Sequence, residues 1–525
     1  MSGQGTVISG QRRKRDSHCL HFSRKTSRCA QVDSALESRH KGKLWLDHSI
    51  QGRRRFKRKT CSGFPGIEPV TVLPAPLRGG SVRGCRLLPQ RFDHASSGEP
   101  VVNRALANAI VNQLTVSKNN LLRPSTWQSF DERDWERTLN WLDLSGLALY
   151  LRQRLEMTNC LSVLPHRVRE RLDRCEADNR LRVATMTEEL KILNDMFSRA
   201  GVEHLVLKGI TLFPDYCPDP AIRTQYDHDF LIRLESVQRT EELLQAAGYR
   251  RKNSENEHPI VYYRPEPEVR FWADFVGFYS PRLGRSIELH FRLWESAAER
   301  IEINLPEDFF ERASRRRWQD FEYMSLSVED ILIFQVLHAF RHVLRNWCRL
   351  SVFLEIAYFL NQRFSDSRFW KRFADRIDNL RWVPEATVVV FSLAELLFGA
   401  AIPPEIKARL TSASFPALAL WTERYGRCSA LANFRNDKYS LFLHREFVED
   451  QAAWAGIRRQ RLFPMHRPHR PPAAVFQRGF SRVEKLWVQG AHALRRLKFH
   501  AISALRYACE YPQWALLRRA RLERN

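Results

Sequence analysis

The chain has 525 residues, of which 44% are hydrophobic and 11% aromatic, a composition typical of two or three packed domains. Its formal net charge of +25 lies mainly at the ends, because residues 1–100 carry 20 Lys and Arg against 7 Asp and Glu, and residues 451–525 carry 16 against 3. Residues 101–450 carry 48 basic and 49 acidic side chains, so nothing in this nearly neutral body indicates a nucleic-acid groove.

The ten cysteines include no Cys-x-x-Cys pair and have no regular spacing, which argues against a zinc site and a disulfide framework. A reducing compartment is the simpler interpretation, and we expect a cytoplasmic protein. No apolar core follows the basic residues of the N-terminus, so we expect no secretory signal. The most apolar run, residues 386–402, is interrupted by Glu395 and closed by two prolines, and it predicts a buried helix instead of a membrane span.

Residues 1–100 are rich in Arg, Ser, Gly and Pro and show no sustained hydrophobic period. We predict a disordered basic extension over this range. An RNA- or membrane-binding tail, a solvated extension and translation from an upstream start remain open for it.

Residues 101–200 have a helical pattern and predict a helical subdomain. Apolar residues recur at spacings of three and four along one helix that is expected to end near Gly201: Val183, Met186, Leu190, Leu193 and Phe197. Residues 141–151 predict a further apolar helix.

Residues 201–300 change to a strand period and predict a small α/β core. Strands are expected over 204–210, 226–232, 258–264, 269–279 and 286–292, and a turn-rich loop over 213–220. A helix is expected over 234–247, with Gly248 as its C-terminal stop. The predicted fold class is therefore α+β, in which a small mixed sheet is flanked by helical subdomains, the second of them over 301–412.

Asp227 and Asp229 lie two residues apart in the predicted strand over 226–232. Strand side chains alternate between faces, so the two carboxylates point the same way with backbones about 6 to 7 Å apart. Two such carboxylates repel each other unless a metal, an Arg or protons compensate, and the pair can bind a hard cation. An exposed turn or a solvated strand end is the alternative.

Glu288 and His290 share one face of the strand over 286–292, while Ile287, Leu289 and Phe291 take the other. A third carboxylate can thus face the aspartate pair from a neighbouring strand. Three convergent carboxylates suit one or two divalent ions and a nucleoside triphosphate. An exposed carboxylate for Glu288 and a histidine hydrogen-bonded in a core for His290 are the alternatives.

Several short segments are informative in combination: Val206-Leu-Lys-Gly209, Tyr216-Cys-Pro-Asp-Pro-Ala-Ile-Arg223, Tyr226-Asp-His-Asp-Phe-Leu-Ile232, Leu243-Leu-Gln-Ala-Ala-Gly-Tyr249 and Ile287-Glu-Leu-His-Phe-Arg-Leu293. Together they resemble the uncharacterised nucleotidyltransferase family of bacteria, which belongs to the polymerase-β-like nucleotidyltransferase superfamily. The resemblance covers about 105–410, including 326–332, 338–342 and 349–360.

The resemblance implies a metal-dependent enzyme that transfers a nucleoside monophosphate from ATP or another nucleoside triphosphate to a hydroxyl, with Mg²⁺ or Mn²⁺ as cofactor. It implies that the catalytic, metal-binding residues are Asp227, Asp229 and Glu288. It further implies that the nucleotide phosphates are bound by Lys208, Gly209 and Arg223. The superfamily's usual loop has Gly-Gly or Gly-Ser where this chain has Lys208-Gly209.

Other interpretations of the cationic and histidine side chains stay open. Lys208 can equally lie at a solvated strand end. Arg223 can equally form a structural ion pair with Asp227 or Asp229. His338 and His342 lie four residues apart on one helix face, but a zinc site would need a third ligand, so helix packing or substrate contact is favoured. Glu355 stands where the family more often has Asp.

Residues 413–525 form a basic, aromatic region with helical character over 480–520, where apolar residues stand among arginines: Leu486, Trp487, Leu494, Leu497, Leu505 and Trp514. This pattern is consistent with weak contact to an anionic membrane surface or a nucleic acid, or with docking on the protein's own body.

Two other function classes compete with the nucleotidyltransferase. A glycosyltransferase also uses Asp-x-Asp to bind a metal and a sugar nucleotide, but it normally has a larger doubly wound sheet before the motif. A non-catalytic nucleotide-binding protein on the same fold would be expected to have lost acidic ligands, and all three carboxylates are present. The acceptor, which can be a protein side chain, a small molecule, a sugar or an RNA end, is not identified by the sequence.

Overall fold

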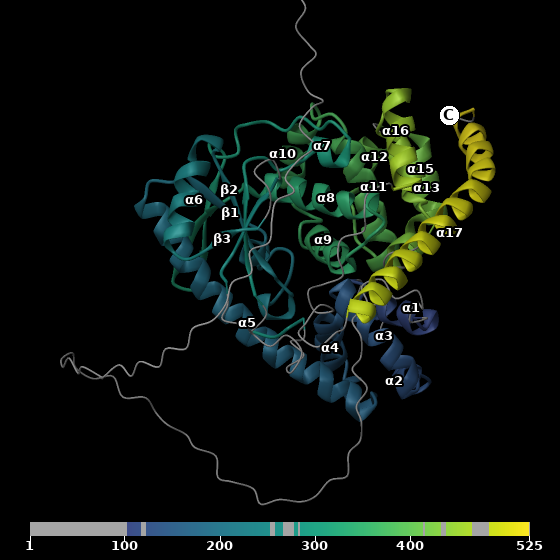
Figure 1. Cartoon of the computed structure of the whole chain (residues 1–525), viewed down its shortest axis with the longest axis horizontal. Coiled ribbons are helices and arrows are strands. Elements are labelled where there is room, and N and C mark those ends of the chain that lie inside the picture. Colours follow the sequence, from purple (N-terminus) through teal and green to yellow (C-terminus); the bar gives the residue numbers. More distant parts are fainter. Residues whose placement is uncertain are drawn as a thin grey trace, which may run out of the picture. The chain divides into compact units, whose positions relative to one another are not determined.

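The computed structural model describes residues 102–116, 122–252, 258–265, 278–281, 284–412, 415–431, 437–464 and 482–523. The predicted extension over 1–100 and nearly all of the predicted strand over 269–279 lie outside these residues. The described part confirms the α+β class (Figure 1). It contains one seven-stranded mixed sheet, and helical segments precede and follow the strands along the sequence.

The helices before the sheet are α1 (Arg104–Gln113), α2 (Pro124–Gln128), α3 (Glu132–Ser145), α4 (Ala148–Met157) and α5 (His166–Arg199). The single helix expected over 141–151 is wrong. Gly146 has a φ of +74° and ends α3, so the chain turns before α4 begins. A Cβ at Gly146 would lie 2.6 Å from Ser351 Oγ, so this turn also permits close approach to a later helix.

The sheet has the strand order β3-β4-β5-β2-β1-β7-β6. Its strands are β1 (His204–Leu207), β2 (Asp227–Ile232), β3 (Arg250–Arg251), β4 (Ile260–Tyr263), β5 (Ser286–His290), β6 (Ser314–Trp318) and β7 (Phe321–Ser325). Strands β2 and β5 are parallel neighbours, as are β1 and β7, and the other neighbours are antiparallel. The register pairs Asp229 with Glu288 on one side and with Leu207 on the other.

The two faces of the sheet are covered by different helices. The predicted stripe of α5 is buried except for the half-buried Val183, and its later part packs with Phe230 and Leu289 on one face. Helix α6 (Val237–Ala246) adds Leu244 to this core. Because strand residues alternate, Asp227 and Asp229 point to the opposite face.

The helices after the sheet begin with α8 (Val328–Leu344), after the short α7 (Ser296–Glu299), and continue with α9 (Leu350–Gln362), α10 (Ser367–Ile377), α11 (Val383–Phe398), α12 (Pro404–Ser412), α13 (Pro416–Trp421), α14 (Arg427–Leu431), α15 (Ser440–Glu446), α16 (Gln451–Leu462) and α17 (Arg482–Leu522). Helix α11, expected to be buried, packs against α8 and α9. Among the described helices, none combines the length and apolarity needed to cross a membrane.

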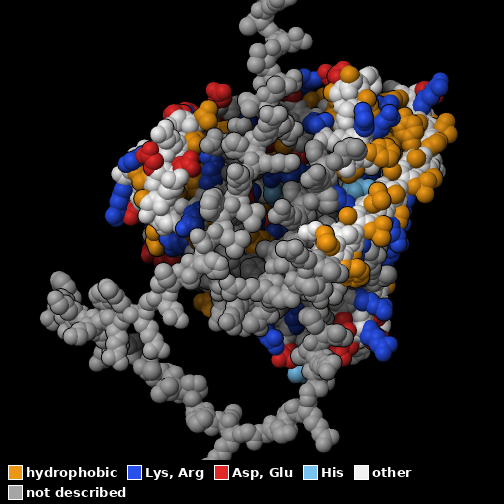
Figure 2. Space-filling view, in the orientation of Figure 1, with side chains coloured by type: hydrophobic (Ala, Val, Ile, Leu, Met, Phe, Trp, Pro, Cys, Tyr) orange, Lys and Arg blue, Asp and Glu red, His pale blue; other side chains and the backbone are white. Residues whose placement is uncertain are grey.

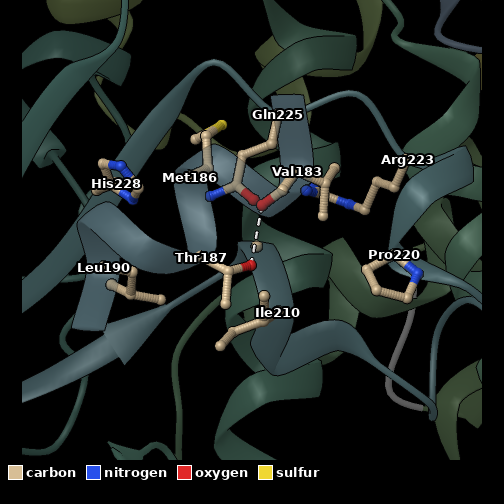
Figure 3. Close-up of a pocket in the computed structure, with 10 residues that line it drawn as sticks. Val183, Met186, Thr187, Leu190, Ile210, Pro220, Arg223, Gln225 and His228 are labelled. Carbon is tan, nitrogen blue, oxygen red and sulfur yellow. Dashed lines mark hydrogen bonds between the residues drawn. The ribbon is translucent and has the colours of Figure 1, made fainter. Parts of the chain in front are cut away.

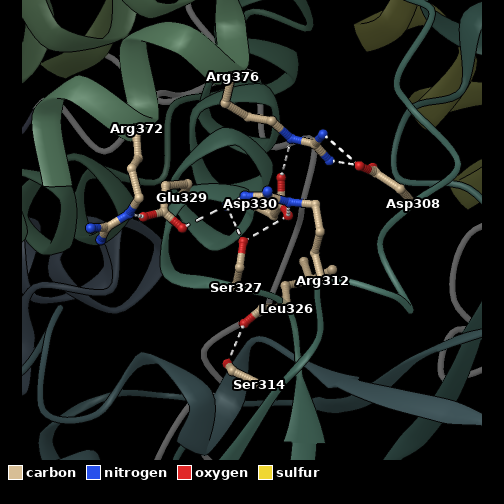
Figure 4. Close-up of polar contacts among 9 residues, drawn as sticks. All are labelled: Asp308, Arg312, Ser314, Leu326, Ser327, Glu329, Asp330, Arg372 and Arg376. Carbon is tan, nitrogen blue, oxygen red and sulfur yellow. Dashed lines mark hydrogen bonds and ion pairs between the residues drawn. The ribbon is translucent and has the colours of Figure 1, made fainter.

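A buried carboxylate fixes the start of α8. Asp330 is fully buried and accepts hydrogen bonds from Arg312 Nε at 3.1 Å, Arg376 Nε at 2.9 Å and Ser327 Oγ at 2.7 Å (Figure 4). These donors come from the segment before β6, from α10 and from the N-cap of α8. The network therefore ties α8, which carries His338 and His342, to the sheet and to α10.

Replacing Ser327 by Ala is expected to lower the free energy of unfolding by about 1 kcal/mol, because its hydroxyl caps α8 and also donates to Asp330. Chemical denaturation of the purified variant measures this loss. The control is Ser198→Ala in the exposed last turn of α5, which is expected to change stability by less than about 0.5 kcal/mol. Equal stability of the two variants would contradict the capping role.

Candidate functional site

The acidic face of the sheet brings together the three carboxylates predicted from the sequence. Asp229 is buried and Asp227 is half-buried on β2, while Glu288 comes from the parallel neighbour β5. The side chains of Asp229, Glu288 and His290 each offer a ligand atom, and these atoms all lie within 4.8 Å of one another. This is the only such group of three among the residues that the structure describes.

Asp229 has one oxygen with two partners and one with none. Its Oδ1 accepts a hydrogen bond from Lys208 Nζ at 2.6 Å and lies 3.0 Å from His290 Nε2. Its Oδ2 is buried and has no hydrogen-bond partner. A buried carboxylate oxygen of this kind is costly unless a ligand binds it.

Lys208 and Gly209 form the loop that leaves β1 beside this carboxylate. Both have a positive φ, +51° for Lys208 and +54° for Gly209, and for Lys208 this conformation is strained. The Lys208 side chain is only 10% exposed and points to Asp229, so it is not a solvated strand end. A Cβ at Gly209 would lie 2.5 Å from Gln225 Nε2, so glycine allows Gln225 to close over the loop.

A small pocket lies on the other side of this loop. It is lined by residues of α5 and by Gly209, Arg223, Gln225 and His228 (Figure 3). Because strand side chains alternate between faces, His228 points away from the face of Asp227 and Asp229. Gln225 also donates a hydrogen bond to the Asp227 carbonyl oxygen at 2.7 Å. The pocket therefore lies behind the acidic face, not on it.

Arg223 pairs with Glu355 instead of with either aspartate. Its Nε lies 3.2 Å from Glu355 Oε2, and Tyr150 Oη donates to Glu355 Oε1 at 3.0 Å. Burial lowers the pKa of Arg223, but the Glu355 charge outweighs this and raises it above its usual range. Glu355, which stands where the family more often has Asp, links α9 and α4 to the segment before β2.

His338 and His342 contact each other on α8, with their Nε2 atoms 3.1 Å apart. Arg341 donates to His338 Nδ1 at 3.1 Å, and His342 Nδ1 lies 3.1 Å from the Trp347 carbonyl oxygen. Burial, the other histidine and the Lys208 charge lower the pKa of His338 well below its usual value. Among the described residues, no group of three metal-binding side chains includes this pair, so the structure provides no zinc site here.

The carboxylates have very different pKa values because their surroundings differ. Burial, followed by the charges of Asp229 and Asp227, raises the pKa of Glu288 to about 8. Burial and the Asp229 charge also raise the pKa of Asp227. Burial would raise the pKa of Asp229 as well, but Lys208 and His290 hold it well below its usual range. Without a cation, negative charge is thus concentrated on Asp229.

Raising the pH is expected to destabilise the metal-free protein through Glu288. The pKa of this carboxyl is about 8 in the folded protein and 4.5 in the unfolded chain, so between these values the folded protein holds a proton that the unfolded chain has lost. The stabilising contribution of the protonated carboxyl is therefore complete below pH 4.5 and is lost as the pH rises through about 8. We expect wild type to lose about 2 kcal/mol relative to Glu288→Gln between about pH 5 and 7. Denaturation in a chelator at both pH values measures this difference, and parallel profiles would contradict it.

Several residues near the site were not found from the sequence. Gln225 and Arg341 donate hydrogen bonds to the predicted site residues Asp227 and His338, and Tyr150 donates one to Glu355, the partner of Arg223. Arg349 donates to the Thr224 carbonyl oxygen at 3.0 Å. Arg341 lies between His338 and His342 in the sequence, and this position indicates that its side chain is close to the two histidines. Gln225 likewise lies between Arg223 and Asp227 in the sequence, whereas only folding brings Tyr150 to Glu355, which is 205 residues away.

Comparison with known protein families identifies a family for the central part of the chain. The model of a family described as an uncharacterised nucleotidyltransferase matches residues 131–399, which include the acidic face, the loop after β1 and helices α8 and α9. No curated protein and no solved structure matches the chain.

Proposed function

Because the chain belongs to the uncharacterised nucleotidyltransferase family, we propose that it transfers a nucleoside monophosphate from a nucleoside triphosphate to an acceptor hydroxyl. We also propose that the chain belongs to the polymerase-β-like superfamily and that it uses a divalent cation. The residues that would hold this cation are Asp227, Asp229 and Glu288. We also propose a cytoplasmic location, consistent with cysteines that lack paired spacing.

The orphaned Oδ2 of Asp229 is the observation that carries this proposal. Asp229, Glu288 and His290 converge, and Asp227 adds a further carboxylate on the same face. A donor set dominated by carboxylate oxygens fits Mg²⁺ or Mn²⁺, and an imidazole nitrogen beside it suits Mn²⁺ better than Mg²⁺. When bound, such a cation would neutralise the phosphates and lower the pKa of the acceptor hydroxyl.

The remaining residues would bind and orient the nucleotide. Lys208, which is now 2.6 Å from Asp229, can turn to a phosphate oxygen once another cation compensates that carboxylate. Gly209 would offer its backbone to the phosphates, and its missing Cβ makes room for Gln225 beside the loop. Arg223, held by Glu355, would be a fixed cation for a second phosphate oxygen, and His290 would hold Asp229 in its orientation.

Binding of the donor separates this function from its alternatives. A nonhydrolysable nucleoside triphosphate with Mn²⁺ or Mg²⁺ is expected to raise the unfolding temperature by at least about 2 °C, and neither ligand alone is expected to do so. Stabilisation by a sugar nucleotide and not by the triphosphate would favour the glycosyltransferase. Metal-dependent binding of the triphosphate without transfer of a labelled nucleotide to any component of a cell lysate would favour the non-catalytic nucleotide-binding protein.

A further inference from the structure

Helix α17 is attached to the protein by one of its faces. Tyr507 and Trp514 are 5% and 3% exposed, and both rings stack on Phe442 of α15, with centroids 4.9 and 5.3 Å away. Arg518 Nε pairs with Glu446 at 2.7 Å, and Glu510 pairs with Arg424 Nη2 at 2.7 Å. These contacts orient the rest of the helix surface.

A second apolar face of α17 is exposed. Its large side chains are between 65% and 71% exposed, and Figure 2 shows hydrophobic side chains along this helix; we call the set the leucine stripe: Leu486, Trp487, Leu494, Leu497, Leu505 and Leu516. The small exposed residues Gly490, Ala501, Ala508 and Pro512 continue it at helical spacing. From Leu486 to Leu516 the stripe is about 45 Å long.

Basic residues accompany the leucine stripe. Residues 485–509 contain five Lys and Arg and no Asp or Glu. Lys498 and Arg506 are exposed and directly follow Leu497 and Leu505, which places them about 100° further round the helix, at one edge of the stripe. A surface of this kind combines a continuous apolar strip with positive charge beside it.

The chemistry of this face favours an anionic lipid surface over other partners. A nucleic acid would pair with the basic residues, but leucines offer it neither stacking nor hydrogen bonds. A second copy of the same face, or the basic residues 1–100, would bring positive charge to positive charge. An anionic phospholipid surface complements both the apolar stripe and the adjacent charge.

We propose that α17 binds the surface of anionic phospholipid membranes, with the leucine stripe in the interface and Lys498 and Arg506 near the lipid phosphates. The helix lies along the membrane surface, because its opposite face is held by Tyr507 and Trp514. Membrane binding is independent of the nucleotidyltransferase site, since no residue of that site belongs to α17.

Co-sedimentation of the full chain with vesicles tests this inference. The stripe variant is Leu494→Gln/Leu497→Gln/Leu505→Gln, and the control variant is Met157→Gln/Ile192→Gln/Leu234→Gln, which changes three equally exposed apolar residues on other helices and loops, at 69%, 68% and 64% exposure. Wild type and the control are expected to bind vesicles that contain phosphatidylglycerol, and to bind phosphatidylcholine vesicles more weakly. The stripe variant is expected to bind the anionic vesicles at least about tenfold more weakly.

Added salt is expected to weaken binding of wild type, because the basic residues contribute to it. All three proteins are expected to unfold at the same temperature, since the changed side chains are exposed. The inference is overturned if wild type does not sediment with anionic vesicles, or if the stripe variant binds as wild type does. It is also overturned if the stripe variant loses only dimerisation or only RNA binding.

Discussion

Asp229→Asn is expected to lower nucleotidyl transfer at least about a thousandfold, the largest effect of any single substitution. An amide would remove the negative charge that Lys208 and His290 maintain on this residue, and it would replace one of the two carboxylate oxygens by a donor. The assay follows a labelled nucleoside triphosphate into acceptors of a cell lysate, with Mg²⁺ or Mn²⁺ present.

Asp143→Asn is the matched control for this substitution. Asp143 is also buried, pairs with Arg171 and accepts a hydrogen bond from Tyr279 Oη at 2.8 Å, but it lies on α3, outside the acidic face. The control is expected to lose stability and to keep transfer per folded molecule. Labelling by Asp229→Asn at the wild-type level would exclude Asp229 from the chemistry, whereas equal losses in both variants would indicate unfolding.

Lys208→Met is expected to destabilise the metal-free protein by about 3 to 5 kcal/mol, because it leaves Asp229 buried without its cation. Adding Mn²⁺ is expected to recover much of this loss and to stabilise the variant more than wild type, since no ammonium group then competes for Asp229. Chemical denaturation with and without Mn²⁺ measures both effects.

Lys191→Met is the control for the metal effect. Lys191 also makes two ion pairs with carboxylates, Glu188 and Asp320, each at 3.0 Å, but these lie at the surface. Its loss is expected to change the stability little, because solvent screens these surface pairs, and the effect is expected to be independent of Mn²⁺. If Mn²⁺ fails to recover Lys208→Met, Asp229 does not hold the cation.

The alternation of apolar and polar residues was sufficient to predict the acidic face. Strand residues alternate whatever the fold, so the sequence alone assigns Asp227, Asp229, Glu288 and His290 to faces of their strands. The pairing of β2 with β5, which places Glu288 beside Asp229, could not be derived, because strand order depends on packing between distant segments.

Ion-pair partners and helix boundaries were harder to predict from the sequence than the strand face to which each side chain points. An ion pair of Arg223 with one of the aspartates was the alternative interpretation of the sequence, but Arg223 pairs with Glu355, 132 residues away. A helix was expected to continue through Gly146, yet the turn there is fixed by its approach to Ser351 on α9. Both features arise from tertiary contacts, which local sequence patterns do not record.

We propose that Asp229 and Glu288 hold a divalent cation against the phosphates of a nucleotide. A crystal of the protein with Mn²⁺ and a nonhydrolysable nucleoside triphosphate tests it most directly, because manganese gives an anomalous signal. The claim predicts an anomalous peak within about 2.5 Å of carboxylate oxygens of both residues, with Lys208 turned from Asp229 to a phosphate oxygen. Nucleotide bound elsewhere, with Lys208 still on Asp229 and no peak between the two carboxylates, would contradict it.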